Sequence, residues 1–302
     1  MVIPKVWIIS RFVNDTDQAE TVMLWKLIGE QISTIVAPHQ FDCLIDNDGV
    51  RLYHNGLFVK NMPKIVVVRQ GSAITSHQLH VLRALETCGT TVINRPDAIE
   101  RVKSKANQGI HMRNSLIPTP KFMLLRHDTD VSVVEQEIGF PCVVKLHSGS
   151  FGKGVTLIKN RQQFVEFVEM INSLPIRYTE LMLAQEFIEE SSGKDIRVIV
   201  VDGKPIGAMQ RIAQPGEFRA NINQGGHGEK MKLTRELKRL CKKVASVFQL
   251  SICGVDLIET KDGYTVIEVN ANPGFTGFHQ YCSDQAANEI ANFVKGKLNE
   301  QQ

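Results

Sequence analysis

The chain has 302 residues, of which 43% are hydrophobic and 22% charged, and its net charge is +3. These values are typical of a globular chain with two or three lobes, and so small a basic excess does not indicate a nucleic-acid or membrane partner. No apolar run approaches the length of a membrane span and the N-terminus has no signal-peptide pattern, so we expect a cytoplasmic protein. The six cysteines are scattered without a C-x-x-C pair, which favours reduced thiols.

The first part of the chain alternates between strand and helix patterns. Apolar runs and helical periodicity predict, in order, strand Val6–Ser10, helix Asp17–Ile28, strand Lys64–Arg69, helix Ser76–Cys88 and strand Thr91–Asn94. Strands that alternate with helices are typical of a parallel sheet, so we expect a parallel α/β lobe over residues 1–96. Within it, Phe41–Lys60 contains Asp-Gly and Asn-Gly pairs that predict hairpins.

After Pro96 the pattern becomes that of an α+β unit. Its predicted elements are helix Asp97–Arg113, strand segments Lys121–Leu125 and Pro141–Leu146, strand Val155–Lys159 and helix Arg161–Ile171. We expect a small central lobe over residues 97–183.

The remaining residues, 184–302, predict a lobe built on an antiparallel sheet. Its elements are the segment Leu183–Ile188, a hairpin at Asp195–Met209 closed by Asp202-Gly203, a helix at Thr234–Phe248 and a hairpin at 254–270. Thr234 is a suitable N-cap for that helix. The fold class is therefore α/β and α+β together.

The last hairpin carries acids where a structural strand would carry none. A loop at Lys261–Gly263 with Gly at a left-handed position places Asp256 opposite Glu268, and Asn270 lies on the same strand face. Three oxygen donors converging in this way predict a magnesium site. The alternative is an ordinary solvated sheet face, although two paired carboxylates repel each other unless a cation lies between them.

The glycine-rich stretch Ser148–Gly154 joins two predicted strands. Backbone amides at Gly149, Ser150, Gly152 and Gly154 suit close approach to phosphate oxygens, although a plain glycine-rich turn is an equal alternative. Nearby, Lys145 lies inside an apolar strand, where its ammonium needs a polar cleft or an edge position. Lys105, in the helical segment after Pro96, is a second candidate cation.

Further polar residues occur at strand ends and in a glycine-containing loop. Glu186 followed by Phe187 suits a ribose or adenine, and Asp195 shares a strand face with Arg197. Loop arginines are often simply exposed, but beside metal-bound phosphates they stabilise developing charge. The remaining candidates are Arg69, Arg211, Arg219 and Asn221.

The order of these signals resembles that of the RimK-type ATP-grasp ligases over nearly the whole chain. The stretches that carry the resemblance are Val68-Arg69, Asn94–Ile99, Val143–Val155, Gln185–Arg197, Gly216–Gly226, Gly254–Leu257 and Glu268–Gly274. Asn94-Arg95-Pro96 and Cys253-Gly-Val-Asp256 are similar to the animal members that join glutamate to N-acetylaspartate or citrate. Two departures leave the substrate open: Ser104 stands where bacterial relatives carry Asp, and Met209–Ile212 lacks their acidic and second basic residue.

The resemblance implies an ATP-grasp fold and a role for each candidate. ATP would be bound by Lys105, Lys145, Glu186, Phe187 and Asp195, with Arg219 and Asn221 at the nucleotide or phosphate side. Two Mg²⁺ or Mn²⁺ ions would be held by Asp256, Glu268 and Asn270. Arg211 would stabilise the reacting phosphoryl group, and Arg69 and Arg197 would contact a substrate carboxylate.

The expected reaction is ATP-dependent amide formation through an acylphosphate, with glutamate added to an acidic acceptor. A kinase that stops at a phosphorylated product and a non-catalytic Mg-ATP sensor are the alternatives. The resemblance also implies a homo-oligomer, either a dimer or a tetramer, and the small net charge leads us to expect no nucleic-acid or membrane partner.

Overall fold

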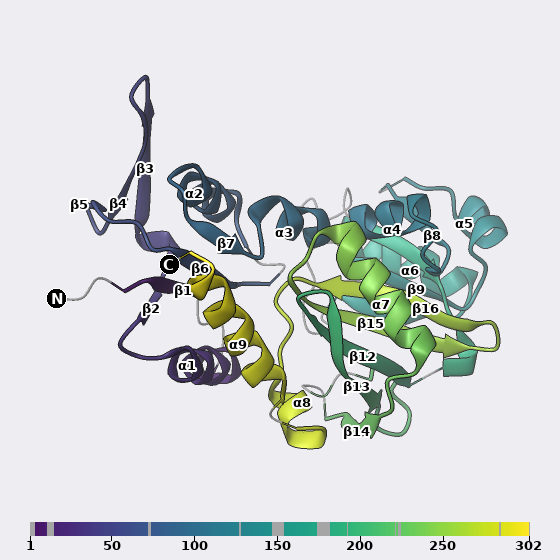
Figure 1. Cartoon of the computed structure of the whole chain (residues 1–302). Helices are drawn as coiled ribbons and strands as arrows, with labels where there is room; N and C mark the ends of the chain where they lie inside the picture. Colours follow the sequence, from purple (N-terminus) through teal and green to yellow (C-terminus); the bar gives the residue numbers. More distant parts are fainter. Residues whose placement is uncertain are drawn as a thin grey trace.

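The computed structural model describes residues 4–10, 15–71, 74–126, 128–146, 154–173, 182–191, 193–220, 222, 225–283 and 285–301. Three main sheets follow one another along the chain. The N-terminal sheet lies at the left of Figure 1, and the two later sheets lie at the right.

The N-terminal sheet is parallel and covered on both faces. Its strand order is β2 (Ser33–Val36), β1 (Val6–Ser10), β6 (Ile65–Arg69) and β7 (Thr91–Ile93). Alternate side chains of β1 point to opposite faces. Val6 and Ile8 pack in one apolar cluster with helices α1 (Asp15–Ile28) and α9 (Gln285–Asn299), and Trp7 and Ile9 pack in another with α2 (Ser76–Thr87). The predicted parallel α/β lobe is thus confirmed, and it is completed by a helix from the other end of the chain.

A three-stranded arm projects from this lobe (Figure 1). After the short helix η1 (Pro38–Gln40) it consists of β3 (Phe41–Asp46), β4 (Gly49–His54) and β5 (Leu57–Phe58), which form the hairpins expected there. Several large apolar side chains of the arm are exposed, namely Leu44, Ile45, Leu57 and Phe58.

The central sheet is antiparallel, in the order β10 (Val155–Ile158), β9 (Cys142–Leu146), β11 (Met182–Glu186) and β8 (Phe122–Leu125). Two helices, α5 (Val131–Glu137) and α6 (Arg161–Asn172), cover one face of this sheet. Their residues Val134 and Phe164 pack in one core with Val144 of β9. Since neighbouring strand residues point to opposite faces, Lys145 lies on the side of β9 away from these helices.

The C-terminal sheet is also antiparallel, in the order β14 (His227–Met231), β13 (Lys204–Ile212), β12 (Lys194–Val201), β15 (Ile252–Thr260) and β16 (Gly263–Asn270). Helix α7 (Arg235–Phe248) covers one face through Leu237, Cys241, Val244 and Phe248, and its predicted N-cap Thr234 accepts from the Leu237 amide. Beside it lie α3 (Pro96–Lys103) and α4 (Lys105–Asn114). The 3-10 helix η3 (Glu189–Ser191) precedes the sheet, and α8 (Thr276–Tyr281) follows it.

Two predictions about local structure were wrong. The single helix expected at Asp97–Arg113 is two helices, because Ser104 has an extended backbone (φ −100°, ψ 123°) and its hydroxyl caps α4 by accepting from the Asn107 amide. The last hairpin turns over two residues rather than three, since Thr260 pairs with Gly263. The register then shifts by one residue next to Asp256, so the predicted pairing of Asp256 with Glu268 is nevertheless present.

The lobe boundaries do not coincide fully with packing. Residue 183 lies within β11 of the central sheet, and α9 packs on the N-terminal sheet. The division at 96 and 183 remains a prediction. Within the described ranges, none of the helices is both long and apolar enough to cross a membrane.

Candidate active site

The face of the C-terminal sheet opposite α7 is half apolar and half polar. Ile199 and Val201 of β12 lie in the apolar half with residues of α8 and α9. Two and four residues earlier on the same face are Arg197 and Asp195, which begin the polar half. Strand pairing then places Arg211 beside Asp195 and Asp256 beside Arg197. A charged patch therefore follows directly from the register of three strands.

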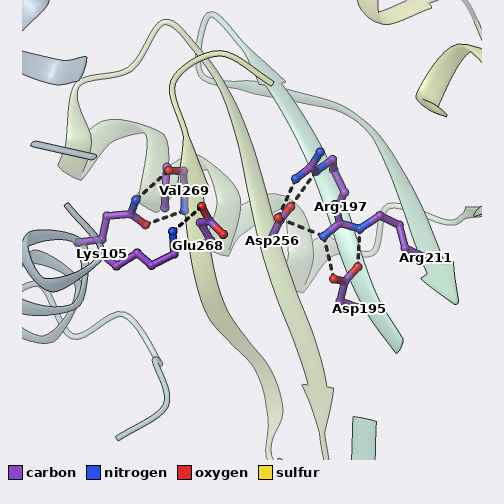
Figure 2. A network of polar contacts seen from close by, with 8 residues as sticks. Lys105, Asp195, Arg197, Arg211, Asp256, Glu268 and Val269 are labelled. Atoms are coloured by element: carbon purple, nitrogen blue, oxygen red, sulfur yellow. Dashed lines mark hydrogen bonds and ion pairs between the residues drawn. The ribbon is translucent and has the colours of Figure 1, made fainter. Parts of the chain in front are cut away.

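These four side chains form one ion-pair network (Figure 2). The Arg211 guanidinium donates from Nε and Nη2 to the two oxygens of Asp195, at 2.5 and 2.7 Å. Its Nη2 also lies 3.0 Å from Oδ2 of Asp256. Because the Arg211 side chain is 4% exposed, its position is set by these carboxylates rather than by water.

The network holds Asp256 and Arg211 in their charged forms, whereas burial raises the pKa of Asp195 despite its contact with Arg211. Burial raises the pKa of Asp256, but Arg197 and Arg211 outweigh it and hold that pKa below its usual range. Burial likewise opposes the charge of Arg211, and Asp195 and Asp256 together raise its pKa. Both residues are therefore charged at neutral pH, and the patch keeps cations and anions side by side out of water.

Two lysines approach the same patch. Lys105, the first residue of α4, lies with Nζ 3.5 Å from Oε1 of Glu268. Lys145 of the central sheet donates to Oε1 of Gln185 at 2.7 Å. Burial lowers the pKa of Lys145 to about 8, while Glu268 and Asp256 raise it and Lys105 lowers it further. Lys145 is therefore close enough to Glu268, Lys105 and Asp256 for their charges to act on it.

A second group lies where the central and C-terminal sheets are joined. Glu186 ends β11, and the ring of Phe187 after it meets Phe218 edge to face at 6.3 Å. The guanidinium of Arg219 lies 5.6 Å from the Phe218 ring centroid and donates to Glu217 at 3.0 and 2.7 Å. Two of the expected nucleotide residues, Phe187 and Arg219, are thus brought together through Phe218.

Arg69 occupies a different environment from the one expected of a substrate ligand. Its Nη2 donates to Oε2 of Glu20 at 2.6 Å, and its Nη1 donates to the carbonyl of Pro273 at 3.3 Å. The Arg69 and Glu20 side chains are 5% and 3% exposed. The other oxygen of Glu20 accepts from the amides of Phe275 and Thr276, so this buried pair joins the N-terminal lobe to the segment after β16.

Some of the expected residues lie outside the described ranges. Gly149, Ser150 and Gly152 of the glycine-rich stretch and Asn221 of the loop belong to this group. Gly154 is described and has a φ of 74°, a conformation that favours glycine.

Comparison with known proteins identifies the family. A sequence profile of the RimK-like ATP-grasp domain matches residues 100–294. A protein named probable alpha-L-glutamate ligase from Vibrio vulnificus (strain YJ016) is 33% identical over 294 residues, which cover 96% of this chain and 95% of that protein. The chain belongs to the RimK-like ATP-grasp family.

Solved structures confirm the ATP-grasp fold of this RimK-like chain. The ATP-grasp ligase PsnB, complexed with a phosphomimetic variant of its minimal precursor, Mg and ADP, has a TM-score of 0.73 and 17% identity, and the match covers 99% of this chain and 100% of that one. A D-alanine–D-alanine ligase from Bacillus anthracis has a TM-score of 0.71 and 14% identity, with 99% of each chain covered. At such identities the likeness shows the fold alone.

The RimK-like chain has a donor set that fits a divalent metal. Asp256 and Glu268 are directly opposed on β15 and β16, and Asn270 lies two residues further along the same face. Three arginine contacts to Asp256 leave lone pairs on its oxygens, and Glu268 has a side chain that is 32% exposed. Two carboxylates and an amide suit Mg²⁺, which keeps several sites for water and phosphate. In the described part of the chain no group of three or more His, Cys, Asp or Glu side chains could hold a metal ion, so a metal site would need a mixed set such as this one.

Three residues that contact the candidate residues or their strands were not predicted from the sequence. They are Glu20, Gln108 and Gln185, each of which contacts a candidate residue or its strand. For Gln108 a signal was present, because it lies three positions after Lys105 and thus on the same face of a helix. For Glu20 and Gln185 we find no local signal in the sequence.

Proposed function

We propose that this chain is an ATP-dependent carboxylate–amine ligase that joins glutamate to an acidic acceptor and releases ADP and phosphate. The observation that carries the proposal is the direct opposition of Asp256 and Glu268 beside Arg211, Arg197, Lys105 and Lys145, in a chain of the RimK-like family. The names of the Vibrio relative and of the ADP-bound PsnB support the reaction class and the nucleotide.

In the proposed reaction a carboxylate oxygen of the acceptor attacks the γ-phosphorus of ATP, forming an acylphosphate and ADP. The amine of glutamate then attacks the acyl carbon, and phosphate leaves as the amide forms. Positioning and charge neutralisation supply most of the catalysis in phosphoryl transfer. Arg211 suits this task because its two carboxylate partners fix the guanidinium while leaving it fully charged.

The chain's other residues would take distinct parts. Lys145 and Lys105 would hold phosphate oxygens, with Glu186, Phe187, Asp195 and Arg219 at the nucleotide side. Two Mg²⁺ or Mn²⁺ ions would be held by Asp256, Glu268 and Asn270. When bound, they would neutralise phosphate charge. Arg197, whose side chain is 19% exposed, would contact a substrate carboxylate with the edge not used by Asp256.

We also propose a reducing, cytoplasmic setting and a homo-oligomer. All six cysteines are free thiols, which suits a reducing compartment. The exposed apolar side chains of the β3–β5 arm suit contact with another copy of the chain.

The test is an ADP-release screen of acidic acceptors with glutamate, followed by product mass. An amide product with free phosphate supports the ligase, whereas a phosphorylated acceptor would identify a kinase. Glu268→Ala is expected to abolish ADP release with a competent substrate pair. Unchanged turnover in that variant would refute the metal assignment, and tight nucleotide binding without any turnover in the wild type would point to a sensor.

A further inference from the structure

The outer side of strand β16 is bound by the Pro118 carbonyl, which accepts from the Val266 amide at 2.8 Å, and by the side chain of one glutamine. β16 is the last strand in the order of the C-terminal sheet, so the backbone groups on its outer side have no neighbouring strand. At Val269 they meet Gln108 of α4 instead. The Val269 amide donates to Oε1 of Gln108 at 2.7 Å, and Nε2 of Gln108 donates back to the Val269 carbonyl at 3.0 Å.

The side-chain amide of Gln108 uses both of its N–H groups. Nε2 also donates to the carbonyl of Val102, at the end of α3, at 2.6 Å. Gln108 is 3% exposed, so water does not compete for these three bonds. A buried amide bound to three backbone groups has one orientation, and it joins α3, α4 and β16 into one unit.

The point of attachment lies inside the proposed metal site. Val269 separates Glu268 from Asn270, two of the three proposed ligands, whose side chains leave β16 on the opposite face from the Val269 side chain. The pairing of β16 with β15 also shifts by one residue just before Glu268, so the ladder on the inner side is interrupted there. The outer attachment by Gln108 restrains β16 where its inner pairing is weakest.

The same helix supplies a charged contact to the site. Lys105 lies three residues before Gln108 on α4, and its Nζ is 3.5 Å from Glu268. α4 therefore contacts β16 twice: Gln108 binds the backbone of Val269, and Lys105 lies beside the carboxylate of Glu268.

We propose that Gln108 is a positioning residue that sets the direction of Glu268 and Asn270 towards the divalent metal. The inference rests on the proposed function, because it assigns a support to that function's metal site. Residues that orient metal ligands typically change metal affinity by about 10- to 100-fold when removed. A glutamine that served only folding would change stability and leave that affinity alone.

The experiment measures Mn²⁺ binding to the full chain at saturating ADP, from the electron paramagnetic resonance signal of free Mn²⁺. Gln108→Leu removes all three bonds and leaves an apolar side chain that is one atom shorter, and it is expected to weaken Mn²⁺ binding by about tenfold or more. The matched control is Gln78→Leu, which removes another buried glutamine, 5% exposed, whose Oε1 accepts from the Thr75 amide in the N-terminal lobe. The control is expected to lose stability and to bind Mn²⁺ like the wild type.

The outcomes separate this inference from the proposed function. If the wild type binds no Mn²⁺ with ADP, the proposed metal site fails; if it binds Mn²⁺ and Gln108→Leu binds equally well, Gln108 has no positioning role. Should Gln108→Leu fail to fold, Gln108→Asn takes its place, since it keeps the amide but is one methylene too short to reach Val269. Wild-type Mn²⁺ affinity in folded Gln108→Asn would overturn the inference, and weakened affinity would support it.

Discussion

The guanidinium of Arg197 donates to both carboxylate oxygens of Asp256, at 2.8 and 2.7 Å, from the neighbouring strand. The two residues are direct partners in the pairing of β12 with β15, so the sheet register alone brings them together. Such a two-pronged contact lets the protein bury Asp256 in its charged form. The acid proposed as a metal ligand is therefore neutralised in the protein itself, before any other cation is considered.

Removal of Arg197 is expected to destabilise the protein. In Arg197→Ala the Asp256 carboxylate, whose side chain is 6% exposed, retains Arg211 but loses its main partner. Breaking a buried ion pair in this way typically costs about 3–5 kcal/mol. Urea denaturation would measure the loss, with Arg161→Ala as the control, because the Arg161–Glu135 pair is 48% exposed on both sides and should contribute under about 1 kcal/mol. Equal losses in the two variants would contradict this account.

The pH dependence of ATP use should depend on Lys145. Its pKa is lowered to about 8 by burial, so its ammonium loses its proton as the pH rises through that value. If the charged form binds phosphate, kcat/KM for ATP falls above a pH of about 8, since this ratio reports ionisations of the free enzyme. Lys145→Arg keeps its charge throughout and should show no such fall. The prediction fails if the two proteins have the same pH profile between 7 and 10.

Arg211 and Arg219 should differ in the step that they affect. Arg211→Lys cannot donate to both oxygens of Asp195 as the guanidinium does, so the cation is displaced from the reacting groups. We expect kcat to fall by about 100-fold with a small change in KM for ATP. Arg219→Lys, further along beside Phe218, should raise KM for ATP and change kcat less. Steady-state kinetics would give kcat and KM for ATP in both variants. An equal fall of kcat in the two variants would contradict the prediction.

How much the sequence could predict depended on how local each signal was. The Asp256–Glu268 pairing was predicted from a three-residue turn, and it is present because a one-residue shift of register offsets the shorter turn. The two-residue turn and the later shift of register were not predicted, since both arise from how the strand is held by its neighbours. The break between helices α3 and α4 at Ser104 was also not predicted, because a serine within a charged helical pattern is equally compatible with a helix interior.

Contacts between segments far apart in the chain could not be predicted from the sequence. The contact of Arg197 with Asp256 joins residues 59 positions apart, and that of Gln108 with Val269 joins residues 161 apart. Helix α9 shows no sign in its own residues that it packs on the N-terminal sheet. Such pairings follow from the register and order of whole sheets, which single-segment patterns do not contain.

Arg69 tests the difference between a structural pair and a substrate ligand. It is bound to Glu20, and both side chains are at most 5% exposed. Arg69→Met would leave the Glu20 carboxylate without its buried counter-ion, so the free energy of unfolding should fall by about 3 kcal/mol or more. Glu20→Gln removes that charge, and the double variant should regain part of the loss, giving a coupling energy of about 1 kcal/mol or more in a double-mutant cycle. Thermal or urea unfolding of the four proteins measures it. Strictly additive losses, together with a raised KM for the acidic acceptor in Arg69→Met, would favour the substrate role that was expected from the sequence.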